Sequence, residues 1–294
     1  MNLSFDQATG KYSFVSPDGK TYASINKSYL QSKCDELWST PAGKIPEIHS
    51  ATVQEFSINE RFTFLEKLVR MVATGIQCSG IVTGRGGLGK SYTITKTLEN
   101  MGYTDISGNP DFQTYPGQKV FRTIKGFSTP RAFYEALYNN NGIVLICDDV
   151  DSLQKDKDTV NLLKAALDSY SKRIVCWCSA SKNEEIPNSF EYTGRIITIS
   201  NMHPDQFDQA LRTRSMMIDL SMTKDEIVER MEFIAKSSSF MPDMDYDFKM
   251  DAINFIKETK DSTKELSLRT LISVVKIRST CDSDWKNLAK YLLS

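Results

Sequence analysis

One stretch of the chain has the residue types and spacing of a phosphate-binding loop. Its residues are, in order, Gly84, Arg85, Gly86, Gly87, Leu88, Gly89, Lys90 and Ser91. This is the pattern of a glycine, four residues and then Gly-Lys-Ser. Glycines allow backbone N–H groups to converge on phosphate oxygens, which side chains would block. Lys90 would then contact the β- and γ-phosphates, and the Ser91 hydroxyl would bind Mg²⁺.

The residues on either side of this loop favour the strand-loop-helix arrangement that the pattern requires. The apolar run 81–83 predicts a strand leading into the loop, and residues 91–98 predict a helix leading out of it. The positive N-terminus of that helix would face the phosphates, which makes Ser91 and Tyr92 candidate nucleotide contacts. The alternative is a glycine-rich loop that matches the pattern by chance.

A second stretch supplies acids that would work with the loop. The apolar run 143–147 is followed directly by Asp148 and Asp149. Such a run predicts a strand buried on both faces of a parallel sheet, whose carboxyl end is where open α/β sheets bind ligands. Asp148 would hold Mg²⁺, and Asp149 would position and polarise an attacking water. The alternative is a core strand that merely ends in surface acids, and Asp151 is a spare acid that could equally cap a turn.

Further polar residues follow later strands and helices. Asn201 ends an apolar run that predicts a strand beside the acid-bearing strand, where its side chain could hydrogen-bond a γ-phosphate or the attacking water. Arg212 and Arg214 close a short predicted helix that precedes another apolar strand. The alternative for these arginines is a solvated helix end favoured by the helix dipole.

The elements around these residues alternate between strands and helices and then become helical only. Strands are expected near 120–124, 143–147, 173–178, 190–192, 195–201 and 216–220, and helices near 57–77, 130–138, 157–171, 223–237, 246–259, 265–279 and 283–293, with 103–118 as a loop. Ser57 and Glu60 form a predicted capping box for the first helix. We therefore expect an α/β core at 51–220, with a parallel sheet sandwiched by helices, and an all-α domain at 221–294.

The first 50 residues carry no comparable motif. Alternation at 11–15 and 21–25, around a Ser-Pro-Asp-Gly turn, predicts a small β-hairpin. Residues 39–50 have the composition of a linker. The extension at 1–50 is expected either to be decorative or to bind a protein partner.

Composition and charge exclude several classes of protein. The 294 residues are 40% apolar and 25% charged with a formal net charge of -1, which indicates a globular protein that does not coat nucleic acid by bulk charge. His49 and His203 lie far apart, so a histidine-based metal site or triad is not expected. The six cysteines form no Cys-x-x-Cys pair and are expected to be buried thiols. No signal peptide or membrane-spanning run is evident, so we expect a cytoplasmic protein that binds no membrane.

Taken in order, these motifs resemble those of the AAA+ family of ATPases over residues 55–294. The resemblance rests on the loop, on Asp148-Asp149, on a sensor-one-like Asn201, on the arginine-finger-like Arg212 and Arg214, and on a sensor-two-like Ser267-Leu268-Arg269. It implies that ATP and Mg²⁺ bind between the α/β core and a helical lid. Arg269 would contact the γ-phosphate within its own subunit. Arg214, or else Arg212, would reach the site of the next subunit, which implies a homo-oligomer such as a hexamer.

The acidic pair departs from the commonest AAA+ pattern, because most members have Asp-Glu there. Paired aspartates occur in the viral superfamily III helicase branch, which also carries a β-hairpin before the sensor-one strand. Residues 174–178 and 190–193, with a polar tip near Lys182, resemble that hairpin, although an ordinary surface hairpin is the alternative. The chain also looks like AAA-type ATPases of tailed phages, which implies the host cytoplasm as its location.

The resemblance leaves several functions open. The leading hypothesis is an ATP-hydrolysing motor that acts on nucleic acid, as a helicase, a helicase loader or another replication or packaging factor. The second is a protein-remodelling or regulatory ATPase, for which Phe127 is the candidate pore-loop aromatic and 1–50 the candidate docking segment. A non-catalytic, nucleotide-gated scaffold is a third class, and the intact set of Lys90, Asp148 and Arg269 argues against it.

Overall fold

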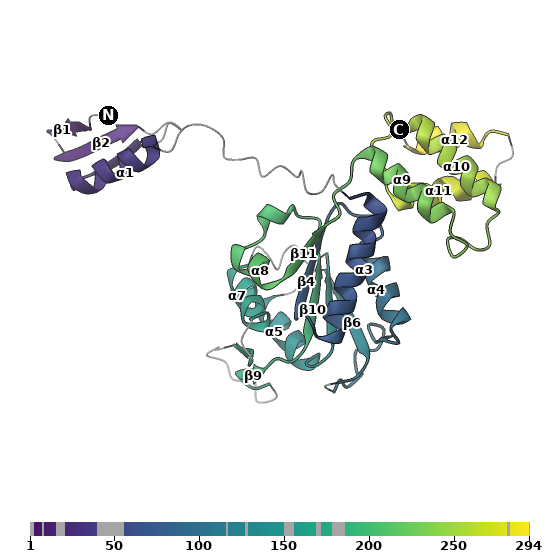
Figure 1. Ribbon diagram of the computed structural model, residues 1–294, viewed down its shortest axis with the longest axis horizontal. Helices are drawn as coiled ribbons and strands as arrows, with labels where there is room; N and C mark the ends of the chain where they lie inside the picture. Colours follow the sequence, from purple (N-terminus) through teal and green to yellow (C-terminus); the bar gives the residue numbers. More distant parts are fainter. Residues whose placement is uncertain are drawn as a thin grey trace. The chain divides into compact units, whose positions relative to one another are not determined.

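The computed structural model describes residues 3–7, 9–15, 21–39, 56–115, 117–126, 129–149, 156–168, 172–177, 186–280 and 283–293. The chain divides into two compact units, Met1–Glu55 and Phe56–Ser294 (Figure 1). Several sequence predictions concern residues outside the described ranges: the linker from residue 40 onward, Phe127, Asp151 and Lys182.

The first unit is a small antiparallel sheet covered by one helix. Its elements are β1 (Ser4–Asp6), β2 (Lys11–Val15), β3 (Thr21–Ser24) and α1 (Lys27–Ser39). The predicted hairpin corresponds to β2 and β3, which pair in antiparallel register with Phe14 opposite Tyr22. The helix buries Leu30 and Cys34 against Phe14. The sequence did not predict β1 or α1, because a three-residue strand is too short to show alternation and α1 has only a weak apolar stripe.

The second unit is built on a six-stranded parallel sheet in the order β11-β4-β10-β7-β6-β5. Its strands are β4 (Ser79–Thr83), β5 (Thr104–Asp105), β6 (Val120–Lys125), β7 (Val144–Asp148), β10 (Arg195–Ile199) and β11 (Met216–Asp219). The predicted α/β core with a parallel sheet is therefore confirmed. The predicted loop at 103–118 was wrong at its start, where β5 adds an edge strand too short to show in the sequence pattern.

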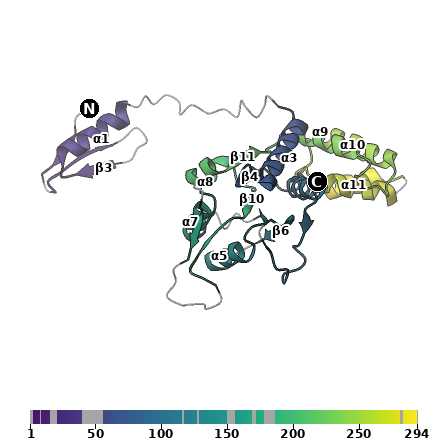
Figure 2. The same ribbon diagram turned by 60° about the horizontal axis from the view of Figure 1, so that its bottom comes forward.

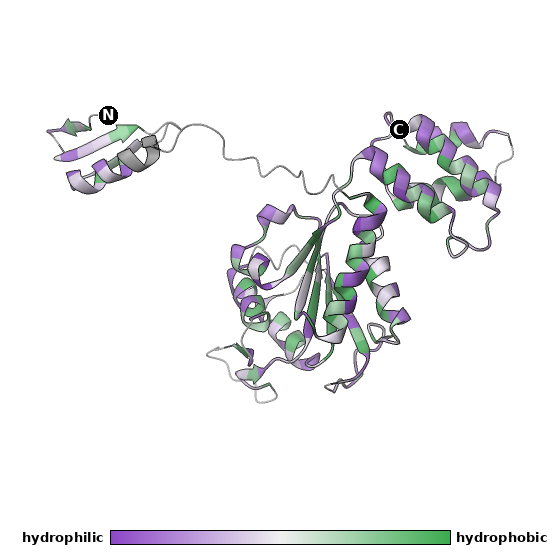
Figure 3. Cartoon of the chain, viewed as in Figure 1, coloured by the Kyte–Doolittle hydropathy of each residue, from purple (hydrophilic) through white to green (hydrophobic). Residues whose placement is uncertain are grey.

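Helices cover both faces of this sheet (Figure 1). One face carries α3 (Ile58–Thr74) and α4 (Lys90–Asn100), and the other carries α5 (Pro130–Asn139), α7 (Lys157–Ala166) and α8 (Gln209–Arg214). The strands of the sheet are mostly apolar, whereas polar residues recur along the helices (Figure 3). The predicted capping box is confirmed: Ser57 and Glu60 bond each other's backbone N–H at the start of α3. The helix expected at 157–171 ends earlier, at Ala166.

A separate pair of antiparallel strands packs with the helices on the second face of the sheet. It consists of β8 (Ile174–Cys176) and β9 (Ser189–Glu191), with Val175 opposite Phe190. Phe190 contacts the rings of Tyr134 and Tyr138 on α5, with centroids 5.3 and 5.2 Å apart. The base of the predicted hairpin is thus present and packed against the core, while its tip lies outside the described residues.

The chain after β11 is helical through α9 (Lys224–Ala235), α10 (Tyr246–Thr259), α11 (Leu268–Thr280) and α12 (Trp285–Leu293). We call these four helices the helical segment; they share their own apolar core (Figure 2). Buried Arg61 of α3 joins this segment to the sheet, because it donates to the Ser221 carbonyl at 2.7 Å and pairs with Glu226 on α9. No helix that the structure describes has both the length and the apolar character needed to cross a membrane.

The cysteines differ in accessibility more than the sequence indicated. Cys34 and Cys147 are buried as predicted, but Cys176 is exposed, because it faces outward from the two-stranded pair β8–β9. Cys178 and Cys281 lie outside the described residues. Burial in the sheet, helped by the adjacent Asp148 charge, raises the pKa of the Cys147 thiol to about 12. Because the thiolate is the nucleophile, Cys147 should be inert at neutral pH.

This contrast is directly measurable by alkylation. At pH 8 in the folded protein, we expect iodoacetamide to modify Cys176 and to leave Cys147 unmodified, as read by mass spectrometry of the corresponding peptides. In concentrated urea both thiols should react at similar rates. Equal modification of the two in the folded protein would contradict the burial of β7.

Candidate functional site

The loop between β4 and α4 has the backbone conformation that its glycines permit. Gly84, Gly87 and Gly89 all have positive φ angles, of 129°, 74° and 90°. A Cβ atom on Gly84 would lie 2.9 Å from the Leu220 carbonyl, so a larger residue would displace the neighbouring strand end. Helix α4 begins at Lys90 without a side-chain cap. Its first N–H groups are therefore available to an anion bound in the loop.

Lys90 is buried beneath the loop. Its ammonium donates hydrogen bonds to the carbonyls of Gly84 and Arg85, the latter at 2.8 Å, and to Asn201 Oδ1 at 3.2 Å. These acceptors are neutral oxygens, and an anionic phosphate oxygen would be a stronger acceptor for the same charge. The residue that the sequence assigned to phosphate contact thus lies where it could make that contact.

The order of the strands brings Asn201 between the loop and the acids. Strand β10 pairs with β4 on one side and with β7 on the other, so residues that follow the three strands lie side by side. Asn201 donates from Nδ2 to Asp149 Oδ1 at 2.9 Å, and its Oδ1 accepts from Lys90. Lys90, Asn201 and Asp149 therefore form one hydrogen-bonded chain across the carboxyl ends of the strands.

The two aspartates are held differently. Val144 and Ile146 of β7 pack with α3 and α4, and Leu145 and Cys147 pack on the opposite face. This alternation directs Asp148, which is nearly buried, to the side of α4 and the loop. Asp149 lies just beyond the strand in the left-handed region, with φ 55°, and is exposed. Asp tolerates that conformation better than most residues, and here it turns the carboxylate toward Asn201.

These residues line one cavity of about 300 Å³. Its walls are Gly86, Gly87, Leu88, Gly89, Lys90, Ser91, Tyr92, Lys125, Asp148, Asp149, Ile199, Asn201, Leu268, Arg269 and Ile272. The start of α11 closes one side, since Leu268 N–H donates to the Gly87 carbonyl at 2.8 Å. Arg269 reaches the cavity from α11 and makes no hydrogen bond or ion pair with the described residues. The loop, both acids, Asn201 and Arg269 are thus brought together.

The donor atoms of the cavity fit a magnesium ion only in the company of a phosphate. Ser91, in the first turn of α4, and Asp148 both line it and offer a hydroxyl and a carboxylate. The described residues contain no group of three or more His, Cys, Asp or Glu side chains that could hold a metal by itself. Mg²⁺ commonly binds through one or two protein ligands together with substrate phosphates and water. The site therefore could hold Mg²⁺ as part of a metal–nucleotide complex.

The structure does not bring Arg212 and Arg214 to this cavity. Both close α8 ahead of Met216, which pairs with Gly80 near the start of β4, whereas the loop follows the end of β4. A strand of this length separates the two ends of the sheet by about 16 Å. Arg214 donates to the Ala210 carbonyl at 3.1 Å and lies 3.7 Å from Asp168. Arg212 pairs with Asp205 at 3.3 Å.

One cation of the cavity was missed in the sequence. Lys125 ends β6 directly beside Asp148 in the β6–β7 register, and its ammonium lies 3.4 Å from the Asp148 carboxylate. The predicted strand 120–124 stopped one residue short of it. A cation at the end of a predicted strand was the signal that could have identified Lys125 as a site residue. The sequence does not show that this strand lies next to the acid-bearing strand.

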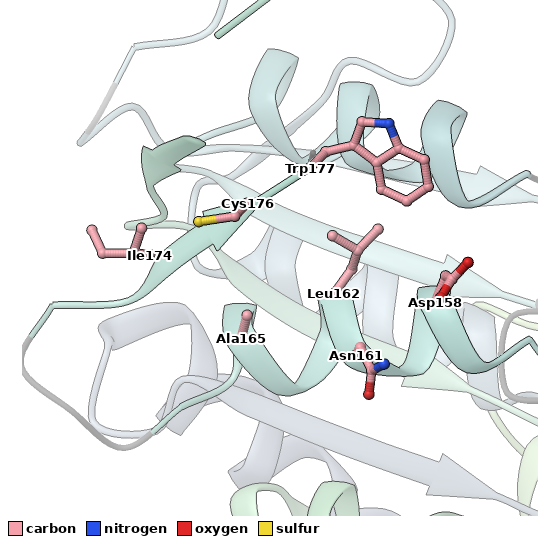
Figure 4. A pocket seen from close by; sticks show the side chains of 7 residues that line it. All are labelled: Asp158, Asn161, Leu162, Ala165, Ile174, Cys176 and Trp177. Atoms are coloured by element: carbon pink, nitrogen blue, oxygen red, sulfur yellow. The ribbon is translucent and has the colours of Figure 1, made fainter. Parts of the chain in front are cut away.

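One further cavity, of about 710 Å³, shares Gly86, Gly87 and Arg269 with the cavity at the loop, and others lie apart from it. One of about 260 Å³ is lined by Asp158, Asn161, Leu162 and Ala165 of α7 and by Ile174, Cys176 and Trp177 of the β8 segment (Figure 4). The Trp177 indole lies above Leu162 in this view, and its Nε1 has no hydrogen-bond partner among the described residues. The cavity lined by α7 and the β8 segment shares no residue with the cavity at the loop.

Comparison with known proteins gives one clear relationship. No family model matches the chain. The chain is 31% identical over 250 residues to an uncharacterised 36.7 kDa protein from the nrdC–mobD intergenic region of Enterobacteria phage T4, in an alignment that covers 79% of this chain and 73% of the phage protein. Identity at this level over most of both chains shows common descent. The chain therefore belongs to the same family as this phage T4 protein.

Proposed function

We propose that the protein is a phage-encoded, Mg²⁺-dependent ATPase of the AAA+ type that acts on nucleic acid. The observation that carries this proposal is the hydrogen-bonded chain Lys90–Asn201–Asp149 across the carboxyl ends of β4, β10 and β7. A buried cation below a glycine loop suits phosphates, and a carboxylate fixed beside it suits the water that attacks them. The order of motifs that resembles the AAA+ family supports ATP as the nucleotide.

Lys90, Ser91, Asp148, Asp149 and Asn201 would then each have a distinct role. The loop N–H groups and Lys90 would bind the phosphates, and Ser91 and Asp148 would hold Mg²⁺, which neutralises charge on the phosphate oxygens. Asp149 would orient the attacking water and accept its proton. Because Asn201 bonds one oxygen of that carboxylate, it would fix the direction in which the other oxygen faces the water. An Asp side chain is shorter than a Glu side chain, so a fixed orientation of the carboxylate would matter more for its contact with the water.

The helical segment would couple the chemistry to movement. Its contacts with the loop include the Leu268–Gly87 hydrogen bond, the burial of Leu88 in its apolar core and the approach of Arg269 to the cavity. A γ-phosphate bound to both the loop and Arg269 would hold core and helical segment together, and hydrolysis would release that contact. The β8–β9 pair, anchored by aromatic rings on α5, is the element that would carry force to the substrate polymer.

The first experiment is steady-state ATP hydrolysis with Lys90→Ala as the inactive variant. We expect this change to lower turnover at least a hundredfold, because it removes the charge under the phosphates. Lys96→Ala is the matched control, since Lys96 lies on the same helix but pairs on the surface with Glu99. Normal turnover by Lys90→Ala would reject the site. Stimulation of the wild type by DNA or RNA, tested against an unfolded protein, separates a nucleic-acid motor from a protein remodeller.

A substitution in the acid pair should slow ATP hydrolysis without weakening ATP binding. We expect Asp149→Asn to bind ATP with near wild-type affinity and to hydrolyse it at least a hundredfold more slowly, because the amide cannot accept the proton from water. Asp156→Asn is the control, since Asp156 caps α7 and asparagine caps equally well. Loss of ATP affinity in Asp149→Asn, measured by calorimetry, would contradict the assigned role.

The arginines at the far end of the sheet give a test of shared sites. We expect Arg214→Ala to fold normally by circular dichroism and to lose turnover by a factor of about 10³ or more, as for a removed arginine finger. Mixing it with the Lys90→Ala protein should restore part of the activity, because intact arginines then face intact loops. Arg212→Ala distinguishes the two candidate residues. Absence of rescue at every mixing ratio would argue that each chain works alone.

A further inference from the structure

Lys125 and Asp148 form an ion pair inside the cavity that the proposed reaction leaves unexplained. They are the last paired residues of the β6–β7 ladder, so the backbone itself places them side by side. The ammonium lies 3.4 Å from the carboxylate, and both residues line the cavity. Gly126 follows with a φ of 86°, which turns the chain away immediately after Lys125.

This pair differs from an ordinary surface salt bridge in the environment of its acid. Only 7% of the Asp148 side chain is exposed, against 69% of the Lys125 side chain. The carboxylate therefore stays fixed at the strand end, while the lysine reaches it from solvent and can withdraw at little cost. Exposed lysines contribute little to stability through such pairs, so a structural role is a weak explanation for it.

Lys125 pairs with the Asp148 carboxylate, which is the group that Mg²⁺ would need as a ligand. In the absence of metal, the ammonium neutralises Asp148 and adds positive charge to a cavity that Lys90 also lines. With metal present, the same ammonium competes for the carboxylate and repels the dication. Lys125 would therefore strengthen the binding of metal-free nucleotide and weaken the binding of metal-bound nucleotide.

We propose that Lys125 is a positioning residue that stands in for Mg²⁺ at Asp148 and so sets how strongly nucleotide binding depends on the metal. This inference rests on the proposed function, because it assigns a role within the same nucleotide site. Lys125 favours binding of the nucleotide before the metal and weakens the binding of the metal in the final complex.

The measurable quantity is the coupling between metal and nucleotide. It is the ratio of the ADP dissociation constant in EDTA to that in saturating Mg²⁺, each determined by calorimetry on the full chain. Lys125→Gln should weaken ADP binding in EDTA and tighten it in Mg²⁺. We expect the ratio to rise by about three- to tenfold, the effect of removing one charge at this distance in a partly solvated site. ADP avoids turnover, so the readout is independent of hydrolysis.

Two variants serve as controls. Lys125→Arg keeps the charge and should keep the wild-type ratio. Lys96→Gln removes the same charge from the exposed side of α4 and should leave the ratio within twofold of wild type. Thermal unfolding of each variant checks that the fold is retained.

The outcomes separate this inference from the function on which it rests. A raised ratio in Lys125→Gln alone supports it. If the wild type binds ADP and the ratio is unchanged, or if both affinities fall together, the role of Lys125 is overturned while the nucleotide site stands. If the wild type binds no ADP with or without Mg²⁺, the proposed function and this inference fail together.

Discussion

The parallel ladder that joins β4, β10 and β7 determines where the loop, Asn201 and the two aspartates of the site lie. Because the strands run in the same direction and in fixed register, the loop after Thr83, Asn201 and the two aspartates emerge at one edge of the sheet. A one-residue slip of β10 would turn Ile197 and Ile199 out of the core shared with α3, so apolar packing enforces the register. The hydrogen bonds from Lys90 to Asn201 and from Asn201 to Asp149 depend on that register.

A second constraint acts between the sheet and the helical segment. Arg61 is buried on α3 and is bonded across the junction to Ser221 and Glu226. Arg230 of α9 stacks on Phe62 at 3.8 Å, and burial lowers its pKa to about 10, so it stays charged at neutral pH. Two cations held in this way fix the first turn of the segment on α3. The position from which Arg269 enters the cavity follows from that anchoring.

The parts of the fold around the site that the sequence predicted correctly are those encoded locally. The loop, the strand before it and the capping box at Ser57 each lie within a few consecutive residues, where propensity and geometry agree. Asn201 was predicted to lie beside the acid-bearing strand, and the structure shows that it does. Lys125 was missed because its meaning depends on which strand lies next to β7. Cys176 was assigned to the core because an apolar run does not reveal that its sheet has only two strands.

The position of Arg214 bears on whether one chain can complete the site. Across the length of β4 its guanidinium cannot reach the cavity of its own chain, whose lining already includes the cations Lys90, Lys125 and Arg269. Among the described residues, the guanidinium of Arg214 has modest contacts: one hydrogen bond to the Ala210 carbonyl and a carboxylate at 3.7 Å, beyond hydrogen-bond distance from Nε. A partly exposed pair of this kind contributes at most about 1 kcal/mol. A charge-assisted hydrogen bond to a phosphate is stronger than a pair held at 3.7 Å, so the proposed shared site would require the Arg214 side chain to give up only weak contacts.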